Sequence, residues 1–181
     1  VSGYTVRTQK LLQELRRQDV AVYPATRMGY PATIGVVPTR DSVSVDDINY
    51  FLLLPSRMSL QRAQNRRKAI NLLVEMARQL DITLLHTTTD FRNASLISEV
   101  ARILEIPWVY EVRGERDKTL ELENSGQRSR EFLAEFRRRE TQAMQAASAV
   151  LVLSDVSRRR VEERGVPKDN IYVVPNGFDR C

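Results

Sequence analysis

The chain has 181 residues, and its 28 Lys and Arg outnumber its 23 Asp and Glu, which gives a formal net charge of +5. Hydrophobic residues make up 42% and charged residues 28%, so the chain can bury a core, and the disordered and collagen-like classes are excluded. No apolar run approaches the roughly 20 residues that a membrane-spanning helix needs, and no signal-peptide pattern opens the sequence. These numbers indicate one soluble, basic domain.

Cysteine and histidine are nearly absent. Cys181 is the single cysteine and cannot form a disulfide within the chain, as is typical of proteins from a reducing compartment. One histidine and no clustered ligand spacing argue against a metal site. We therefore expect a cytoplasmic protein with no metal and no other cofactor.

The first part of the chain predicts a helix, a short strand and a loop. Apolar residues at helical spacing follow Gly3 and predict a helix that ends near Asp19. The apolar run 20–23 then predicts a strand, and the stretch 25–42, which is rich in Gly and Pro, predicts a loop.

Two β-rich runs come next, at 43–45 and 48–54. They form either a hairpin or one interrupted strand, because only two aspartates separate them. A long apolar stripe predicts a helix over 59–80, and the nearly all-apolar run 82–86 predicts a buried strand.

The middle of the chain alternates in the same way. A helix is predicted over 93–104 and a strand over 108–112, after Pro107. The polar stretch 113–129 predicts an irregular loop, and a second long helix is predicted over 130–147.

The last part predicts a strand over 149–153, a short helix over 155–164 that ends before Gly165, and a final strand over 171–174. The alternation of helix and strand predicts an α/β fold, a Rossmann-like, mostly parallel sheet with helices on both faces. Ligands of such sheets bind outside the carboxyl ends of the strands. The tips to examine are therefore Ser2-Gly3, His86 to Asp90, Arg113-Gly114, Ser154-Asp155 and Asn176-Gly177.

Segments at these tips resemble a known family. Taken in order, they resemble the motifs of retaining GT-B glycosyltransferases of family 4, whose strand-end signature has two histidines separated by one residue. The resemblance extends over nearly the whole chain, and the segments that carry it are Ser2–Thr8, Leu84–Thr88, Ile106–Gly114, Ala147–Ser154 and Ile171–Asp179.

The resemblance implies how the chain is organised. Residues 1–174 would be the amino-terminal, acceptor-binding Rossmann-like domain, and residues 175–181 would start the interdomain linker. The first strand of the sheet is expected upstream of Val1, because Gly3 stands where a first strand would meet the first helix. The donor-binding carboxyl-terminal domain would lie outside this sequence.

One departure from the family pattern limits what is carried over. The second histidine of the signature is Thr88 here, which could supply a hydroxyl hydrogen bond but no imidazole. The glutamate pair of the family belongs to the donor domain. We dismiss Glu115/Glu123 and Glu123/Glu131, which match its spacing, as chance occurrences.

The resemblance assigns roles at the first two tips. Gly3 would allow close backbone approach and a positive φ, and the helix N-terminus behind it would receive the donor phosphate; the alternative is a plain tight turn. His86 would hydrogen-bond the acceptor or a sugar hydroxyl, or else be a structural histidine. We expect Thr88 to bind, and Thr89 and Asp90 to cap the next helix.

The later tips complete the expected acceptor site. Arg113, beside Gly114, would bind a phosphate or carboxylate of the acceptor; the alternative is an ion pair with Glu111 or Glu115. The resemblance adds Ser154 to the acceptor site and makes Asn176 and Gly177 the hinge between domains.

Three basic runs, 66–68, 137–139 and 158–160, fall on predicted helices. Three adjacent residues do not share one helical face, so we interpret them mainly as solvated surface. The weaker alternative is attraction to anionic lipid headgroups at the inner face of the membrane. Nucleic acid is not expected as a partner, because the runs lack interleaved aromatic residues.

The sequence therefore predicts part of a retaining glycosyltransferase that moves a hexosyl group from a nucleotide sugar to a sugar, a lipid-linked or another small hydroxyl acceptor. The chain alone is expected to be inactive. The alternatives are another GT-B enzyme, either an inverting transferase or a sugar-nucleotide epimerase, and a non-catalytic Rossmann-like module that binds a partner or an anionic membrane surface.

Overall fold

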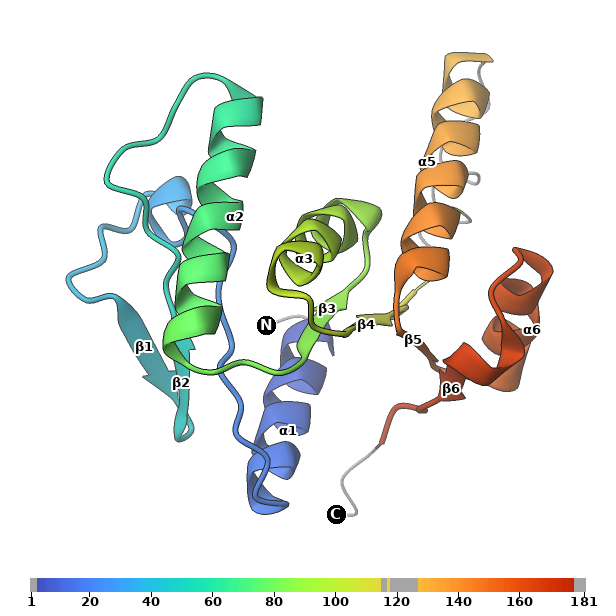
Figure 1. Ribbon diagram of the computed structural model, residues 1–181, viewed down its shortest axis with the longest axis horizontal. Helices are drawn as coiled ribbons and strands as arrows, with labels where there is room; N and C mark the ends of the chain where they lie inside the picture. The colour runs from blue at the N-terminus through green and yellow to red at the C-terminus, as the bar shows by residue number, and fades with distance from the viewer. Residues whose placement is uncertain (1–2, 115–116, 118–126, 178–181) are drawn as a thin grey trace. The chain divides into compact units, whose positions relative to one another are not determined.

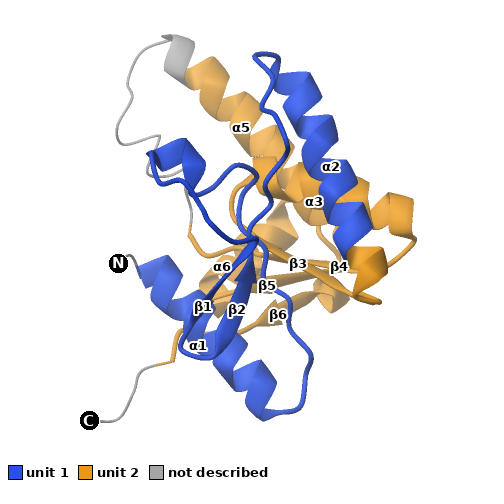
Figure 2. Ribbon diagram, turned by 90° about the vertical axis from the view of Figure 1, so that its left-hand side faces the viewer, with its two compact units in different colours: residues 1–76 blue, residues 77–181 orange. Residues whose placement is uncertain are grey.

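The computed structural model describes residues 3–114, 117 and 127–177. The chain divides into two compact units, residues 1–76 and 77–181 (Figure 2). The elements of the first unit are α1 (Gly3–Arg17), the short helix η1 (Ala32–Ile34), β1 (Ser42–Val45), β2 (Ile48–Phe51) and most of α2 (Arg62–Gln79).

The two β-rich runs of the first unit form an antiparallel hairpin. Ser42 pairs with Phe51 and Val45 with Ile48. The two residues between the strands, Asp46 and Asp47, have φ of 45° and 64°. Two consecutive positive φ angles are typical of the type I′ turn, whose twist matches that of the strands that it joins. Of the two expected arrangements, the hairpin is therefore correct.

The first helix is bonded to this hairpin. Gln9 of α1 donates from Nε2 to the Val45 carbonyl at 2.8 Å and accepts from the Tyr50 hydroxyl at 2.5 Å. Arg16, near the end of α1, donates to the carbonyl of Asp47 in the turn. Polar side chains of α1 thus fix its position against the hairpin, since α1 has no fully buried residue of its own.

The predicted strand at 20–23 is wrong. The amide of Val20 still bonds to the Leu15 carbonyl at 3.0 Å and so belongs to the end of α1. Pairing with β2 starts only at Pro24, whose carbonyl accepts from Phe51, and it amounts to one parallel bridge between Ala25 and Phe51. An apolar run does not form a strand unless a neighbouring strand pairs with it, and β2 pairs with this segment only at Ala25.

The second unit is a parallel sheet with its crossover helices (Figure 1). Its four strands are ordered β3-β4-β5-β6, and all three pairings are parallel. The expected Rossmann-like α/β class, a parallel sheet flanked by helices, is confirmed. The elements are β3 (Leu85–Thr88), α3 (Phe91–Leu104), β4 (Trp108–Glu111), α5 (Gln127–Ala146), β5 (Ala149–Val152), α6 (Asp155–Glu163), η2 (Lys168–Asn170) and β6 (Ile171–Val173).

The expected buried strand at 82–86 is wrong in two respects: the strand lies two to three residues further along the chain, at Leu85–Thr88, and none of its residues is fully buried. Ile82 donates to the Ala77 carbonyl at 2.9 Å and thereby ends α2, and the ladder begins where Leu85 donates to Pro107. The strand consequently ends at Thr88 instead of His86. Both His86 and Thr88 therefore belong to β3 itself.

Alternation along the strands gives the sheet two different faces. On one face, Trp108, Tyr110, Val150, Val152 and Ile171 are almost fully buried. They form one core with residues of α3, α5 and α6. Because side chains alternate, His86, Thr88 and Glu111 point to the opposite face. The apolar packing of one face therefore determines which side of the sheet receives the polar residues.

The hairpin turn gives a first prediction. Asp47→Gly should raise the free energy of unfolding by about 1 kcal/mol, because glycine adopts positive φ without the steric cost that other residues carry. Urea denaturation of the purified chain measures the change. Asp47→Ala is the control: it removes the same carboxylate but keeps a Cβ, and it should give no gain. An equal gain in both variants would mean that charge, not backbone conformation, is the cause.

Candidate functional site

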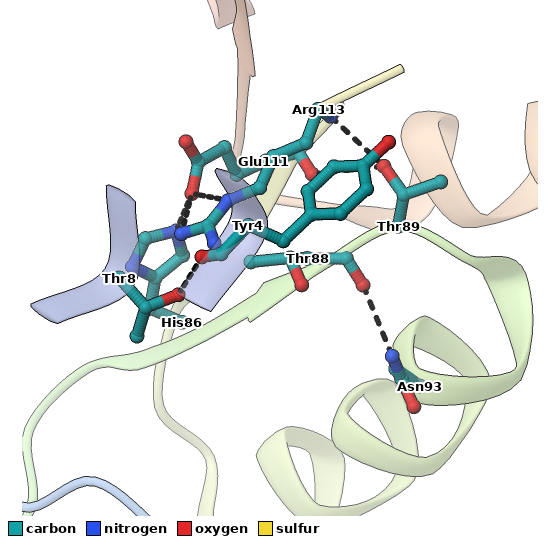
Figure 3. A network of polar contacts seen from close by, with 8 residues as sticks. All are labelled: Tyr4, Thr8, His86, Thr88, Thr89, Asn93, Glu111 and Arg113. Atoms are coloured by element: carbon teal, nitrogen blue, oxygen red, sulfur yellow. Dashed lines mark hydrogen bonds and ion pairs between the residues drawn. The ribbon is translucent and has the colours of Figure 1, made fainter. Parts of the chain in front are cut away.

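Polar side chains of β3 and β4 meet near the carboxyl ends of the two strands. Thr88 is the register partner of Glu111, and His86 lies two residues before Thr88 on the same face. Arg113 follows Glu111 by two residues (Figure 3). The parallel pairing of two strands thus brings together four side chains that are up to 27 positions apart in sequence.

Glu111 is the centre of this cluster. Its Oε2 accepts from Nε and Nη2 of Arg113, at 2.9 and 2.7 Å, and lies 3.3 Å from Nε2 of His86. The side chains of Glu111 and Arg113 are only 1% and 4% exposed, whereas that of His86 is 31% exposed. The alternative that the sequence left open for Arg113, an ion pair with Glu111, is therefore what the structure shows. His86 is therefore the most accessible of these three side chains.

Thr89 ties the ends of the two strands together. Its amide donates to the Glu111 carbonyl at 3.0 Å, and its hydroxyl accepts from the amide of Arg113 at 2.9 Å. The prediction that Thr89 caps α3 is wrong, because the N-cap is Asp90 and the Thr89 hydroxyl accepts from the Arg113 amide instead. Thr89 instead holds in place the backbone that carries Arg113.

Asp90 is the N-cap of α3, as predicted. Its Oδ1 accepts from the amide of Arg92 at 3.0 Å, and its Oδ2 accepts from the guanidinium of Arg92 at 2.8 Å. Asn93, in the first turn, donates to the carbonyl of Thr88 at 3.3 Å. Hydrogen bonds to the end of β3, at Thr88, and to the N-cap of α3, at Asp90, thus stabilise the connection between the two elements.

A second glutamate lies on the core face of the sheet. Glu140 of α5 accepts from the hydroxyl of Tyr110 and, at 2.8 Å, from the amide of Phe91 at the start of α3. Burial raises the pKa of the Glu140 carboxyl, and the charge of Asp90 raises it further, against the hydrogen bonds that lower it. Burial, and then the charge of Glu140, raises the pKa of the Tyr110 hydroxyl as well. This pair joins α5, β4 and α3 inside the core.

The sequence argument missed two members of this region. Glu111 was considered only as a partner of Arg113, although a glutamate in the apolar run Trp108 to Val112 signals a buried charge. Glu140 lies at helical spacing from Phe136 and Met144, which are core residues, so its position on the apolar stripe could have identified it. In both cases, one charged residue occupies a position that the periodicity of the apolar residues assigns to the core.

The remaining predicted site residues occupy other places. Ser154 caps α6, with its Oγ accepting from the amide of Ser157 at 3.2 Å. Gly114 is half-buried directly after Arg113, and Asn176 and Gly177 are exposed beyond β6. The structure brings His86, Thr88 and Arg113 together; Ser154 lies beyond the end of β5 in the same unit.

Gly3 begins α1 in the first unit. It does not have the positive φ that we expected, and a Cβ built there would meet no atom within 4 Å. The backbone at this position therefore does not require glycine. The predicted phosphate role of this helix N-terminus stays a prediction. Ser2, Glu115, Glu123, Phe178, Asp179 and Cys181 lie outside the described residues.

Among the residues described, no three His, Cys, Asp or Glu side chains are grouped so that they could hold a metal ion. Within the same part of the chain, none of the helices combines the length and the apolar character needed to span a membrane.

The chain thus combines a Rossmann-like parallel sheet with polar side chains near the carboxyl ends of β3 and β4, which defines it as an α/β domain. Its family is specific: the chain matches the glycosyl transferase 4-like domain over residues 2–177, and it belongs to that family. The resemblance to the amino-terminal domain of family 4 GT-B glycosyltransferases is thereby confirmed.

Other comparisons are distant. No curated protein matches the chain. One similar solved structure is the UDP-GlcNAc 2-epimerase from Methanocaldococcus jannaschii, with 13% sequence identity and a TM-score of 0.49. The similarity covers 68% of this chain but only 31% of the epimerase chain.

Glu140 gives a prediction about pH. Because its pKa is higher in the folded chain than in the unfolded chain, the folded state takes up the proton first as the pH falls from neutral. The free energy of unfolding of the wild type, relative to that of Glu140→Gln, should therefore increase as the pH falls from neutral toward the ordinary glutamate range and decrease as it rises. Urea denaturation at a series of pH values measures this difference.

Glu135→Gln is the control with the opposite sign. Hydrogen bonds from Arg138 and Arg139 lower the pKa of Glu135 to about 2. Its contribution is present above the ordinary glutamate pKa and is lost as the pH falls toward 2, so this difference should shrink in acid. A Glu140 difference that also shrinks in acid would contradict the assignment.

Proposed function

We propose that the chain is the acceptor-binding domain of a retaining glycosyltransferase that uses a nucleotide sugar. The observation that carries the proposal is the exposed His86 and the neighbouring Thr88 at the sheet rim of a glycosyl transferase 4-like domain. An imidazole and a hydroxyl can exchange hydrogen bonds with sugar hydroxyls, and the buried ion pair beside them gives the site a fixed shape. The acceptor would be a sugar, a lipid-linked sugar or another small molecule with a reactive hydroxyl.

The chemistry would be divided between this domain and a donor domain. This domain would hold the acceptor hydroxyl beside the anomeric carbon, and such positioning can lower a barrier greatly because it replaces a random encounter. Electrostatic stabilisation of the leaving nucleotide diphosphate would supply the rest, with the N-terminus of α1 at Gly3 as one proposed phosphate contact. The nucleotide sugar is then a substrate, and no cofactor is involved. Asn176 and Gly177 would form the hinge to the donor domain.

The predicted acceptor contacts differ in strength of support. His86 and Thr88 present polar groups on one face of β3. Arg113 forms a buried ion pair with Glu111. It would therefore contribute to acceptor binding mainly by fixing the position of Glu111. Gly114 and Ser154 are proposed as outer members of the site. We place the enzyme in the cytoplasm, at the inner face of the membrane when its acceptor is a lipid.

Activity assays test whether catalysis requires both this domain and a donor domain. The chain alone should transfer no sugar from a nucleotide-sugar donor, whereas a protein that joins it to a donor domain should transfer the sugar with its anomeric configuration retained. The assay follows product formation and the stereochemistry of the new bond by NMR. Turnover by the chain alone, or an inverted product, would refute the proposal.

The same assay tests Thr88. In the two-domain protein, Thr88→Val should lower kcat/KM about tenfold, because one hydrogen bond of about 1.4 kcal/mol is lost. Thr88→Ser keeps the hydroxyl and is the matched control, which should retain most of the activity. Equal losses in the two variants would mean that shape, not the hydroxyl, matters at this position.

We also propose a peripheral membrane contact, which a surface of the first unit supports. Segments 30–37 and 58–60 expose large apolar side chains, with Val37 84% and Leu60 105% exposed. The two segments adjoin at Gly29, where a Cβ would lie 3.1 Å from Thr33 and 3.5 Å from Met58. The exposed large apolar residues of these segments are Tyr30, Ile34, Val36, Val37, Met58 and Leu60.

The same segments and their neighbours in sequence are rich in positive charge. Residues 24–40 and 55–68 contain no acidic residue. Apolar insertion combined with cations suits a bilayer that contains anionic lipids. The run 137–139 is less suited, because Arg137 pairs with Asp117 and the other two arginines pair with Glu135. The exposed arginines of the two segments are Arg27, Arg40, Arg57, Arg62, Arg66 and Arg67.

Vesicle sedimentation tests the membrane contact. The chain should bind vesicles of phosphatidylcholine with phosphatidylglycerol and should not bind pure phosphatidylcholine. The double variant Val37→Asp with Leu60→Asp should weaken binding about tenfold or more, since it places charge where the apolar contact would form. Val156→Asp, at an exposed valine of α6, is the control and should bind as the wild type does. Equal binding by all three proteins would contradict this surface.

A further inference from the structure

We infer that Glu111 is a positioning residue: it holds the imidazole of His86 with its Nε2 proton directed inward, so that Nδ1 is left to accept a hydrogen bond from a ligand hydroxyl. The inference rests on the proposed acceptor-binding function and specifies which chemistry the site recognises. It concerns a residue that touches His86 rather than the acceptor itself.

The carboxylate of Glu111 is held in place by hydrogen bonds. Glu111 Oε2 accepts hydrogen bonds from Nε and Nη2 of Arg113 and lies 3.3 Å from Nε2 of His86. Arg113 is in turn held through its amide by the hydroxyl of Thr89. The carboxylate therefore cannot turn away from His86 without breaking bonds that are buried.

The carboxylate determines the location of the proton on the His86 ring. An ionised carboxylate only accepts hydrogen bonds, so Nε2 of His86 must carry a hydrogen to bond with Glu111. In a neutral imidazole the other nitrogen, Nδ1, then has a lone pair and no hydrogen. Nε2 faces the buried carboxylate of Glu111, and the side chain of His86 as a whole is 31% exposed.

The ligand class follows from the lone pair. A lone pair on Nδ1 needs a ligand that donates a hydrogen bond, which a hydroxyl does and a carboxylate or a fully deprotonated phosphate does not. The guanidinium of Arg113, the expected binder of an acceptor anion, directs Nε and Nη2 to Glu111. The cluster is therefore built to select a hydroxyl over an anion, which refines the acceptor expected from the sequence.

The single histidine makes a direct test feasible. In weakly alkaline buffer, where a histidine ring is ordinarily neutral, proton–nitrogen NMR of the labelled chain should show one slowly exchanging imidazole N–H, assigned to Nε2. The double variant Glu111→Leu with Arg113→Met removes both buried charges and keeps apolar packing, so it should fold. Its imidazole N–H should exchange too fast to be seen.

Glu140→Gln is the matched control, since it removes a buried glutamate on the other face of the sheet. It should leave the His86 signal unchanged. Acetate, an anion with no hydrogen-bond donor, should not move the ring resonances when it is added to the wild type. A missing N–H in the wild type, an N–H retained in the double variant or a shift caused by acetate would each overturn the inference.

These outcomes are independent of catalysis. If the N–H behaves as expected while a two-domain protein containing the chain transfers no sugar, the proposed function fails and the role of Glu111 in holding His86 remains. If sugar is transferred but the N–H is unaffected by loss of Glu111, the function stands and the positioning role is refuted.

Discussion

The parallel pairing of β3 with β4 is the constraint on which the site depends. The register that pairs Thr88 with Glu111 places His86 and Glu111 on one face of the sheet, within reach of each other. The opposite face of the same strands packs apolar residues and Tyr110 against the helices. A shift of one residue in this register would exchange the two faces, burying the polar cluster in the core and exposing the core residues.

The fold class could be predicted because each long element carries a strong periodic signal. The limits were at short elements. The run 20–23 has the composition of a strand, yet pairing is a long-range property that composition does not contain. At 82–86 the apolar run predicted a buried strand, but none of these residues is fully buried and Leu84 is exposed. Ile82, the first of them, ends α2 by a backbone bond to Ala77.

The candidate site was predicted in part for a similar reason. Strand ends could be located, and so His86, Thr88 and Arg113 were found. The partner of each polar group could not be chosen, because that depends on register and distance. Thr89 illustrates this: its hydroxyl suits a helix cap by sequence, but a strand neighbour 24 positions away occupies it. The family resemblance supplied order along the chain and left these contacts undetermined.

The ion pair of Glu111 and Arg113 also constrains how this domain can diverge. Replacing either residue alone would strand an uncompensated charge in a place that water hardly reaches, whereas replacing both together need not destabilise the sheet. The two positions should therefore covary among relatives. Relatives that have exchanged the pair for apolar residues would lack the carboxylate that lies beside the histidine here.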